Sequence, residues 1–439
     1  MGFVIAVYFK RAKVKNAEYL RVKGPVIIAM NHPNAFMDPI AFTTLVYPPR
    51  VRYLARGDAF KKGVVSALLE SLGIIPIYRI QDGGKEGLKK NDATYEKVKE
   101  LLKRNKKIII FAEGLCVQER RLRPLKKGVP RMILGCMEDA ELNNLLVVPV
   151  GINYSHPSQF RSTLFCNIGE PIKMANYLNA YKEAPAKTMN QFLADLTPRM
   201  KELIVQIDDQ QLEKVIANIE EIYHYDYLKK EGLKKTNPEH DFIFSTDVVR
   251  IITQAAKITP DKVKALQSHS EDYLAHLKKL KLKDWLINPT KQGSINYTNF
   301  YFRIMLLIVT SPLYIRGIIA SYLPYRLSYE ITKKKVRVIE FKASFNMGIG
   351  AVLFLIYYLL QFVIAYLLLR NAWWAFMVIL SSVITSVFCL YISPFRKKTF
   401  GIYRLLRLKA TNEVLVQKLT TQRSEILSSF RELAISNKI

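Results

Sequence analysis

A histidine and an aspartate stand close together in NHPNAFMD, where His32 is separated from Asp38 by five residues. The apolar run VIIAM before this stretch predicts a buried strand, and PIAFTTLV after it predicts a helix that opens with proline. A histidine beside a carboxylate can take a proton from a hydroxyl, while the carboxylate orients the ring and stabilises the imidazolium. A structural alternative stays open, because an aspartate directly before a proline is a good helix N-cap.

Four further stretches follow in order, each at the end of an expected strand. They contribute Arg79, then Glu113 with Gly114, and then a basic run that ends in Lys126 and Lys127. The carboxyl ends of parallel strands meet at one edge of an open α/β sheet, where such folds bind ligands. The stretches are GIIPIYR (73–79), FAEGLCVQERRLRPLKKG (111–128), VVPVGINY (147–154) and IGEPI (168–172).

Taken together, these stretches resemble the glycerolipid acyltransferase family over residues 24 to about 172. The family carries a His and an Asp with four residues between them, then I-P-x-x-R, F-P-E-G and V-P-[V/I] elements. The motif spacing is most similar to the fungal glycerol 3-phosphate and dihydroxyacetone phosphate acyltransferases, which also carry transmembrane helices after the catalytic domain. Three departures stand out: the five-residue spacing of the pair, Ala112 in place of the family proline, and Leu115 in place of a small hydroxyl residue.

The residues and the resemblance imply the same roles for the pair. His32 would act as general base on the acceptor hydroxyl while its oxygen attacks a thioester carbonyl, and Asp38 would orient the ring. Arg79 would hold the acceptor phosphate, because a guanidinium matches phosphate oxygens in a bidentate way. Glu113 and Gly114 would shape the phosphate pocket, and we expect Glu113 to pair with Arg79 or with a lysine.

Other residues are weaker candidates for the same site. Lys126 and Lys127 would add phosphate contacts, although a solvated basic face is an equal alternative, and Arg56 and Asn34 complete the substrate-binding candidates. An acyl-enzyme on Cys116 is a minor alternative, since no residue next to it in sequence lowers the pKa of its thiol. No set of residues has metal-ligand spacing, so we expect no metal and no cofactor beyond the acyl donor.

The order of the expected elements predicts an α/β fold with a mostly parallel sheet flanked by helices. Short apolar runs alternate with helical stretches such as 60–73 and 91–106. The expected strands are VIIAM (26–30), VRYLA (51–55), IIPIY (74–78), KIIIF (107–111), LLVVPV (145–150) and STLFCNI (162–168). The N-terminal GFVIAVYF is too short to span a bilayer; it is either an interfacial anchor or the first element of the domain.

The chain divides into three expected regions. Residues 1–185 form the acyltransferase domain, residues 186–290 form a helical extension without strands, and residues 291–439 form a membrane region with a helical tail. Within the last region, 345–369 and 372–393 are free of charged residues and long enough to span a bilayer as a tight hairpin.

Basic clusters set the expected orientation of this hairpin. KKKVR precedes it and FRKK follows it, so both lie on the cytosolic side by the positive-inside rule. The earlier run 302–324 is interrupted by Pro312, Arg316 and Gly317. We expect it to form a re-entrant pair of half-helices or an interfacial helix, because a full span would place KKKVR across the membrane from the catalytic domain.

The 439-residue chain has a formal net charge of +29 although half of its residues are hydrophobic. Such an excess of cations suits phosphate-bearing partners: nucleic acid, an anionic membrane surface or phosphorylated substrates. The basic residues flank membrane segments and no recognition motif is present, so we expect no nucleic acid. The four cysteines lie far apart in sequence, which favours a reducing, cytosolic environment.

The sequence therefore predicts an integral membrane acyltransferase with its catalytic domain on the cytosolic face. It would transfer a fatty acyl chain from acyl-CoA or acyl carrier protein to glycerol 3-phosphate or a lysophospholipid such as lysophosphatidate, next to anionic membrane lipids. Two alternatives stay open: acylation of another lipid acceptor such as an aminolipid, and a non-catalytic lipid-binding scaffold that keeps the fold.

Overall fold

The computed structural model describes residues 2–46, 51–57, 73–78, 80–289 and 295–436 of the chain. These residues form two compact units, each assembled from several stretches of sequence. Unit 1 comprises Met1–Gln206, Thr236–Phe242 and Val338–Ser344, and unit 2 comprises Ile207–Lys235, Ile243–Arg337 and Phe345–Ile439. The domain boundaries expected from the sequence stay predictions.

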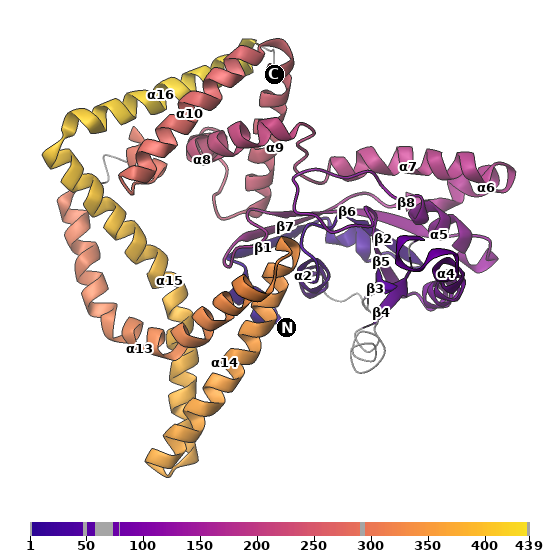
Figure 1. The fold of residues 1–439 in the computed structure, drawn as a ribbon, viewed down its shortest axis with the longest axis horizontal. Helices are drawn as coiled ribbons and strands as arrows, with labels where there is room; N and C mark the ends of the chain where they lie inside the picture. The colour runs from indigo at the N-terminus through magenta and orange to yellow at the C-terminus, as the bar shows by residue number, and fades with distance from the viewer. Residues whose placement is uncertain (1, 47–50, 58–72, 79, 290–294, 437–439) are drawn as a thin grey trace. The chain divides into compact units, whose positions relative to one another are not determined.

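Unit 1 is built on an eight-stranded sheet with the strand order β1-β7-β6-β2-β5-β3-β4, in which β8 pairs with β6 (Figure 1). Every described pairing is parallel except those of β6 with β7 and with β8. This arrangement confirms the predicted α/β fold with a mostly parallel sheet. The strands are β1 Arg11–Lys15, β2 Val26–Met30, β3 Val51–Arg56, β4 Ile74–Ile77, β5 Lys107–Phe111, β6 Leu146–Tyr154, β7 Thr163–Ile168 and β8 Ile172–Lys173.

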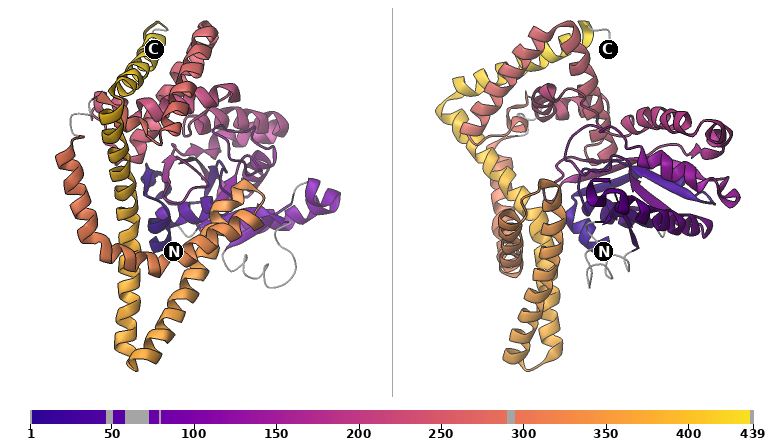
Figure 2. Two further views of the ribbon diagram at one scale, coloured as in Figure 1. Left: turned by 60° about the vertical axis from the view of Figure 1, so that its left-hand side comes forward. Right: turned by 45° about the vertical axis from the view of Figure 1, so that its right-hand side comes forward.

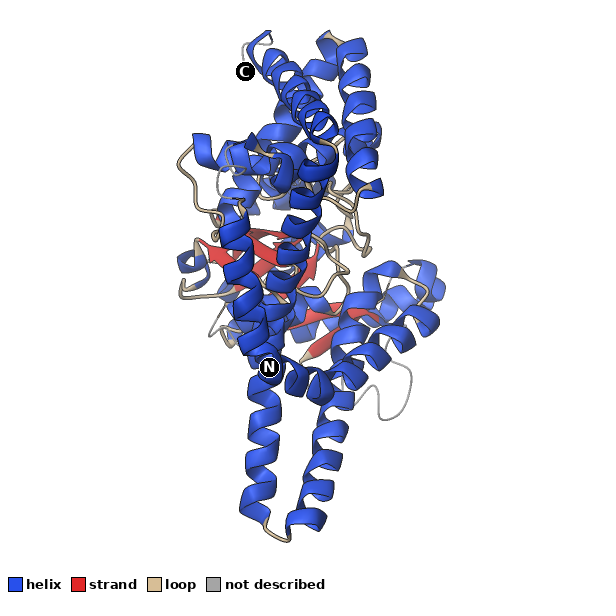
Figure 3. Cartoon of the chain, turned by 90° about the vertical axis from the view of Figure 1, so that its left-hand side faces the viewer, coloured by secondary structure: helices blue, strands red, loops and turns tan. Residues whose placement is uncertain are grey.

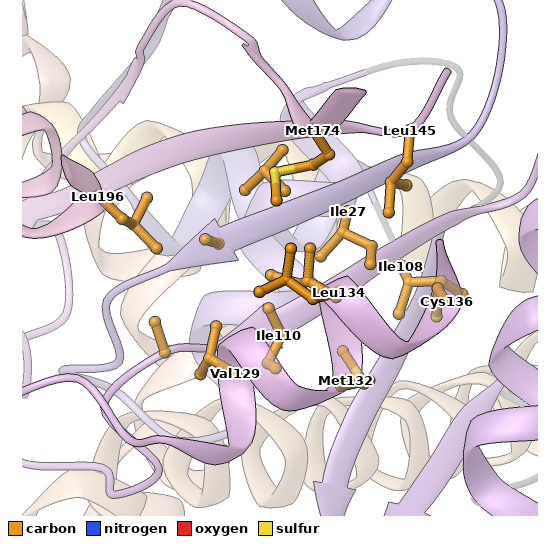
Figure 4. Packing of buried hydrophobic residues seen from close by; sticks show 14 of the residues in the cluster. Ile27, Ile108, Ile110, Val129, Met132, Leu134, Cys136, Leu145, Met174 and Leu196 are labelled. Carbon is orange, nitrogen blue, oxygen red and sulfur yellow. The ribbon is translucent and has the colours of Figure 1, made fainter. Parts of the chain in front are cut away.

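The central strands are apolar on both faces because helices cover both faces of a parallel sheet. All five residues of β2 are buried. On one face, Ile27 and Ile108 pack with Val129, Leu134 and other residues of one apolar cluster (Figure 4). The same cluster takes in helical residues between Val98 and Leu102 and between Phe192 and Ile204, so the helix after residue 185 shares the core of the sheet.

The helices of unit 1 follow the sequence pattern with two differences. The N-terminal apolar segment forms a short helix whose Ile5 and Tyr8 are buried, so it is the first element of the domain rather than a free anchor. The predicted helix at 60–73 falls almost entirely outside the described residues. The remaining helices of the unit are α2 Met37–Leu45, α4 Ile80–Lys103, α5 Gly128–Cys136, α6 Leu178–Glu183 and α7 Pro185–Lys201, with α1 at Gly2–Tyr8.

The edge strand β1 was not expected, because its sequence RAKVK is basic and has only one bulky apolar residue. The segment Thr236–Phe242, distant in sequence, neutralises part of this charge. Glu239 lies 2.7 Å from the amines of both Lys13 and Lys15, and Arg11 lies 3.7 Å from Asp241. The short segment is thereby fixed to unit 1.

The described residues of unit 2 form helices joined by turns and loops, without a strand (Figure 3). Three of its helices, α13, α14 and α15, are long and apolar enough to cross a membrane. Figure 2 shows α14 and α15 as a hairpin joined at a tight turn. The helices are α8 Glu213–Lys230, α9 Pro238–Ile258, α10 Pro260–Lys279, α11 Asp284–Ile287, α13 Tyr297–Lys335, α14 Ile339–Leu369, α15 Ala372–Thr411 and α16 Glu413–Ser436; the first residues of α9 and α14 belong to unit 1.

The interrupted run 302–324 lies inside one continuous helix, α13, and not in two half-helices. Two of the residues that interrupt the apolar run, Arg316 and Gly317, contact α15. Arg316 donates to the hydroxyl of Ser382 at 2.8 Å, and a side chain at Gly317 would collide with the backbone of Thr385. Arg316 and Gly317 thus form a close, polar contact between two apolar helices.

The first turn of α14 belongs to unit 1. Phe341 packs edge-to-face on Phe36 with ring centroids 5.7 Å apart, and the carboxylate of Glu340 accepts a bond from the backbone amide of Gln118 at 3.3 Å. The basic cluster at 333–337 immediately precedes this turn in the chain.

We predict that the two basic clusters and the catalytic unit face the same side of the membrane. Single cysteines at Lys334, Lys398 and Glu170, all exposed, should react with an impermeant maleimide from one side of sealed vesicles. A cysteine at Arg370, in the hairpin turn, should react only from the other side. If Lys334 and Lys398 are labelled from one side and Glu170 from the other, α13 is a full span.

Candidate functional site

The loop between β2 and α2 brings the predicted histidine and aspartate together. The ring Nδ1 of His32 lies 2.8 Å from Oδ2 of Asp38, a hydrogen-bonding distance. His32 keeps 16% of its side-chain surface exposed, whereas the side chain of Asp38 has none. With Nδ1 occupied, Nε2 is the ring nitrogen that can take a proton from a substrate.

Three donors hold the buried carboxylate of Asp38. Besides the histidine ring, the backbone amide of Asn34 donates to Oδ2 at 2.8 Å, and the hydroxyl of Tyr154 donates to Oδ1 at 2.7 Å. Burial and the nearby negative charge of Asp38 raise the pKa of Tyr154 well above its ordinary value, so the phenol stays protonated and remains a donor. A buried carboxylate needs such partners to stay ionised.

The turn explains how a five-residue spacing keeps the pair intact. Helix α2 begins at Met37 with Phe36 in the N-cap position, so Asp38 lies within the first turn and is not the cap. The cap interpretation of Asp38 was therefore wrong. Ala35 adopts a positive φ of 27°, and the carbonyl of Asn34 accepts bonds from the amides of Met37 and Asp38. The extra residue is taken up in this irregular turn.

Phe111, the last residue of β5, fixes the plane of the histidine. The two rings stack with centroids 3.7 Å apart and planes 17° apart. The stacking on Phe111 therefore limits rotation of the His32 ring out of its plane, and the hydrogen bond to Asp38 fixes the orientation of the ring within that plane.

Glu113 anchors the loop that follows β5 to the loop that follows β2. Its carboxylate accepts bonds from the backbone amides of His32, at 3.1 Å, and of Arg123, at 3.0 Å. Among the described residues, no lysine side chain pairs with this carboxylate. The other expected partner, Arg79, lies outside the described residues, so that pairing stays a prediction. Burial raises the pKa of Glu113, and the two amide bonds act in the opposite direction. Glu113 is thus a positioning residue for the site.

Gly114 follows this carboxylate in the chain, and Lys126 packs against the glycine. Gly114 has a positive φ of 64°, and a Cβ there would lie 2.9 Å from Cγ of Lys126, so a larger residue would displace the lysine. The amide of Lys126 bonds to the carbonyl of Ala112. Lys126 and Lys127 are exposed, and Lys127 precedes α5. Both lysine side chains are therefore accessible to solvent, and Lys126 is the one next to Gly114.

The remaining predicted residues are placed differently. Asn34 is fully buried, and its side-chain amide donates to the carbonyl of Pro157 at 2.8 Å. This side chain therefore links the β2–α2 loop to the loop that contains Pro157. Arg56 ends β3, at the same edge of the sheet, but its side chain is not among the described ones. Arg79 lies outside the described residues.

Cys116 is close to the pair but is not activated. Its sulfur accepts a bond from the amide of Ala35 at 2.9 Å. Burial and the charge of Asp38 raise the pKa of the thiol, which disfavours the thiolate that an acyl-enzyme would need.

Two functional contacts were not predicted from the sequence. Tyr154 is the last residue of the stretch VVPVGINY, which the sequence places at a strand end. Its hydrogen bond to Asp38 could not be predicted, because it depends on the order of the strands in the sheet. Asn31 exchanges two hydrogen bonds with the backbone of Ile152, at 3.1 and 2.7 Å, and so ties the end of β2 to β6.

Comparisons with known proteins find similarity to acyltransferases. A model of the Acyltransferase family matches residues 11–153. The chain is 26% identical over 363 residues to glycerol-3-phosphate O-acyltransferase 1 of Saccharomyces cerevisiae, a match covering 77% of this chain and 46% of that protein. Glycerol-3-phosphate O-acyltransferase 2 of the same yeast is 30% identical over 134 residues, covering 30% of this chain and 18% of that protein. The chain thus matches less than half the length of either relative.

One solved structure is also similar to this chain. It is the 1-acyl-sn-glycerophosphate (LPA) acyltransferase PlsC from Thermotoga maritima, with a TM-score of 0.33 and 16% identity. The similarity covers 45% of this chain and 73% of that one.

We predict that Asp38→Asn leaves the fold intact and lowers the transfer rate by roughly 10²-fold or more. The amide oxygen can still accept from His32 and Asn34, and the amide nitrogen can donate to Tyr154, but the negative charge that stabilises the imidazolium is lost. Transfer rates and melting temperatures of purified protein test this. A near-normal rate at an unchanged melting temperature would leave Asp38 with a structural role only.

Tyr154→Phe provides a graded control for the same carboxylate. It removes one of three donors and keeps the charge, so its rate loss should be smaller than that of Asp38→Asn.

Proposed function

Because residues 11–153 form an acyltransferase-family domain, we propose that the chain transfers a fatty acyl group from acyl-CoA or acyl carrier protein to a phosphorylated glycerol acceptor. The observation that carries this proposal is the 2.8 Å contact between His32 and the buried Asp38 at the carboxyl edge of a mostly parallel sheet. The acceptor is glycerol 3-phosphate or lysophosphatidate, and the similarity to two yeast glycerol-3-phosphate O-acyltransferases favours glycerol 3-phosphate.

The reaction is a direct transfer between two substrates. Nε2 of His32 takes the proton of the acceptor hydroxyl as its oxygen attacks the thioester carbonyl. The C–O bond of the ester forms, the C–S bond breaks, and the leaving sulfur takes the proton from the imidazolium. Asp38 stabilises the imidazolium between these two steps. The raised pKa of Cys116 supports this route over an acyl-enzyme.

The acceptor phosphate binds beside Gly114 in this proposal. Gly114 has a positive φ and no side chain, so a ligand can approach its backbone closely, and the side chain of Lys126 packs next to it. Arg79 and Arg56 follow neighbouring strands in the sequence and supply further guanidinium groups. Glu113 contributes by holding the backbone, since its carboxylate would repel a phosphate directly.

The acyl chain approaches from the apolar side of the site. Phe36 and Leu115 are exposed by 38% and 37%, and they belong to the two loops that carry His32 and Glu113. Phe36 also packs on Phe341 in the first turn of α14, a helix apolar enough to cross a membrane. This placement supports a lipid product whose acyl chain leaves toward the bilayer.

We predict that purified protein in lipid vesicles esterifies glycerol 3-phosphate with labelled acyl-CoA, and that His32→Ala lowers the rate by roughly 10²–10⁴-fold. Lysophosphatidate, dihydroxyacetone phosphate and an aminolipid are offered in parallel. His156→Ala is the matched control and should keep the rate. Acylation of the aminolipid alone would replace the proposed acceptor, and no transfer to any acceptor would support a scaffold.

Arg79→Ala should raise the KM for the phosphorylated acceptor much more than it lowers kcat. A phosphate clamp that grips equally in the ground and transition states contributes mainly to binding. Steady-state kinetics with varied acceptor and saturating acyl-CoA measure both constants, with Arg104→Ala as the control. An unchanged KM would remove Arg79 from the site.

A further inference from the structure

A concave site lies within unit 2, and its lining includes neither residue of the His/Asp pair. It is a cavity of about 960 Å³ formed by α8, α10, α11, α15 and the loop between α10 and α11. Seven lysine and arginine residues line it, and among the described lining residues Glu221 is the one carboxylate. We propose that this cavity binds the headgroup of an anionic phospholipid at the membrane surface.

Helix α15 contributes the first group of cations. Arg396, Lys397, Lys398 and Arg404 all line the cavity. Arg404 is oriented by a bond to the carbonyl of Lys281 at 3.1 Å, and the Arg396 guanidinium lies 5.3 Å from the ring centroid of Tyr314. Two guanidinium groups are therefore positioned by neighbours, while the two lysines remain exposed.

The end of α10 and the loop that follows it contribute the second group. Lys278, Lys281 and Lys283 line this side. Glu221 lies 3.1 Å from the amine of Lys283 and neutralises that charge. No carboxylate among the described residues pairs with Lys278, so the cavity keeps a strong excess of positive charge.

The cavity also has an apolar wall. Trp285, Leu274, Leu277 and Phe400 line it beside the cations. A site for a free inorganic anion or a soluble nucleotide phosphate needs no aliphatic wall. A phospholipid presents a phosphate next to its glycerol and acyl chains, and so matches both surfaces.

The position of the cavity along α15 places it at membrane level. The charge-free part of α15 ends at Phe395, and the cationic residues begin at Arg396 on the same continuous helix. If α15 crosses the bilayer, these cations lie at the boundary where lipid phosphates are found, and there they attract anionic lipid. Tryptophan is favoured at the same level.

Trp285 provides a direct reporter. The chain has three tryptophans, and Trp373→Phe with Trp374→Phe leaves Trp285 as the single fluorophore. This full chain, in neutral detergent, is titrated with dioctanoyl phosphatidylglycerol, dioctanoyl phosphatidylcholine, inorganic phosphate and coenzyme A. We expect a saturable change in emission with phosphatidylglycerol and none with phosphatidylcholine.

Charge variants test whether the cavity itself is responsible. Replacing Lys278, Lys397 and Lys398 together by Gln should weaken phosphatidylglycerol binding on the order of tenfold or more, and replacing the same three by Arg should retain it. The matched control replaces the KKK run at 333–335 by Gln and removes equal charge elsewhere; it should bind normally.

Three results would overturn the proposal. Equal responses to phosphatidylcholine would remove the charge requirement. An equal loss in the 333–335 control would indicate bulk electrostatics. Tighter binding of inorganic phosphate or coenzyme A than of phosphatidylglycerol would assign the cavity to a soluble anion. None of these outcomes depends on acyl transfer, so the catalytic proposal stands or falls separately.

Discussion

The negative charge of Asp38 is the constraint on which the site depends. The side chain is fully buried, and the described structure surrounds it with an imidazole, a backbone amide and a phenol in place of a cation. Removing a carboxylate from water is costly unless donors replace the lost hydration. The three donors come from the β2–α2 loop and from β6, so they meet on this carboxylate because β2 and β6 are paired. The orientation of the His32 ring thus depends on the pairing of these two strands.

Much of unit 1 could be predicted from the sequence because its central strands are buried on both faces. VIIAM has no polar residue, and in KIIIF the single polar residue is Lys107 at the start of the strand; the bounds of both runs match β2 and β5. The edge strand β1 could not be found this way. Its RAKVK sequence is balanced by Glu239 and Asp241, which lie more than two hundred residues further along the chain.

The candidate site was predictable in its residue types and less so in its contacts. His32, Asp38, Glu113 and Gly114 follow strands and could be placed at one edge of the sheet. The partners of Glu113 are backbone amides, which no side-chain pattern reveals, and the turn through Ala35 takes a positive φ that is uncommon for alanine. Predicting the hydrogen bond from Tyr154 to Asp38 would have required the strand order, because β2 and β6 are adjacent in the sheet but distant in sequence.

Unit 1 is not contiguous in sequence, because it includes the short segments Thr236–Phe242 and Val338–Ser344. A recombinant fragment that stops at residue 206 would carry the complete sheet and the His/Asp pair. It would also expose the Phe36 face that Phe341 covers and leave Lys13 and Lys15 without Glu239. A water-soluble version of this domain therefore has to replace those two short segments, and shortening the chain is not enough.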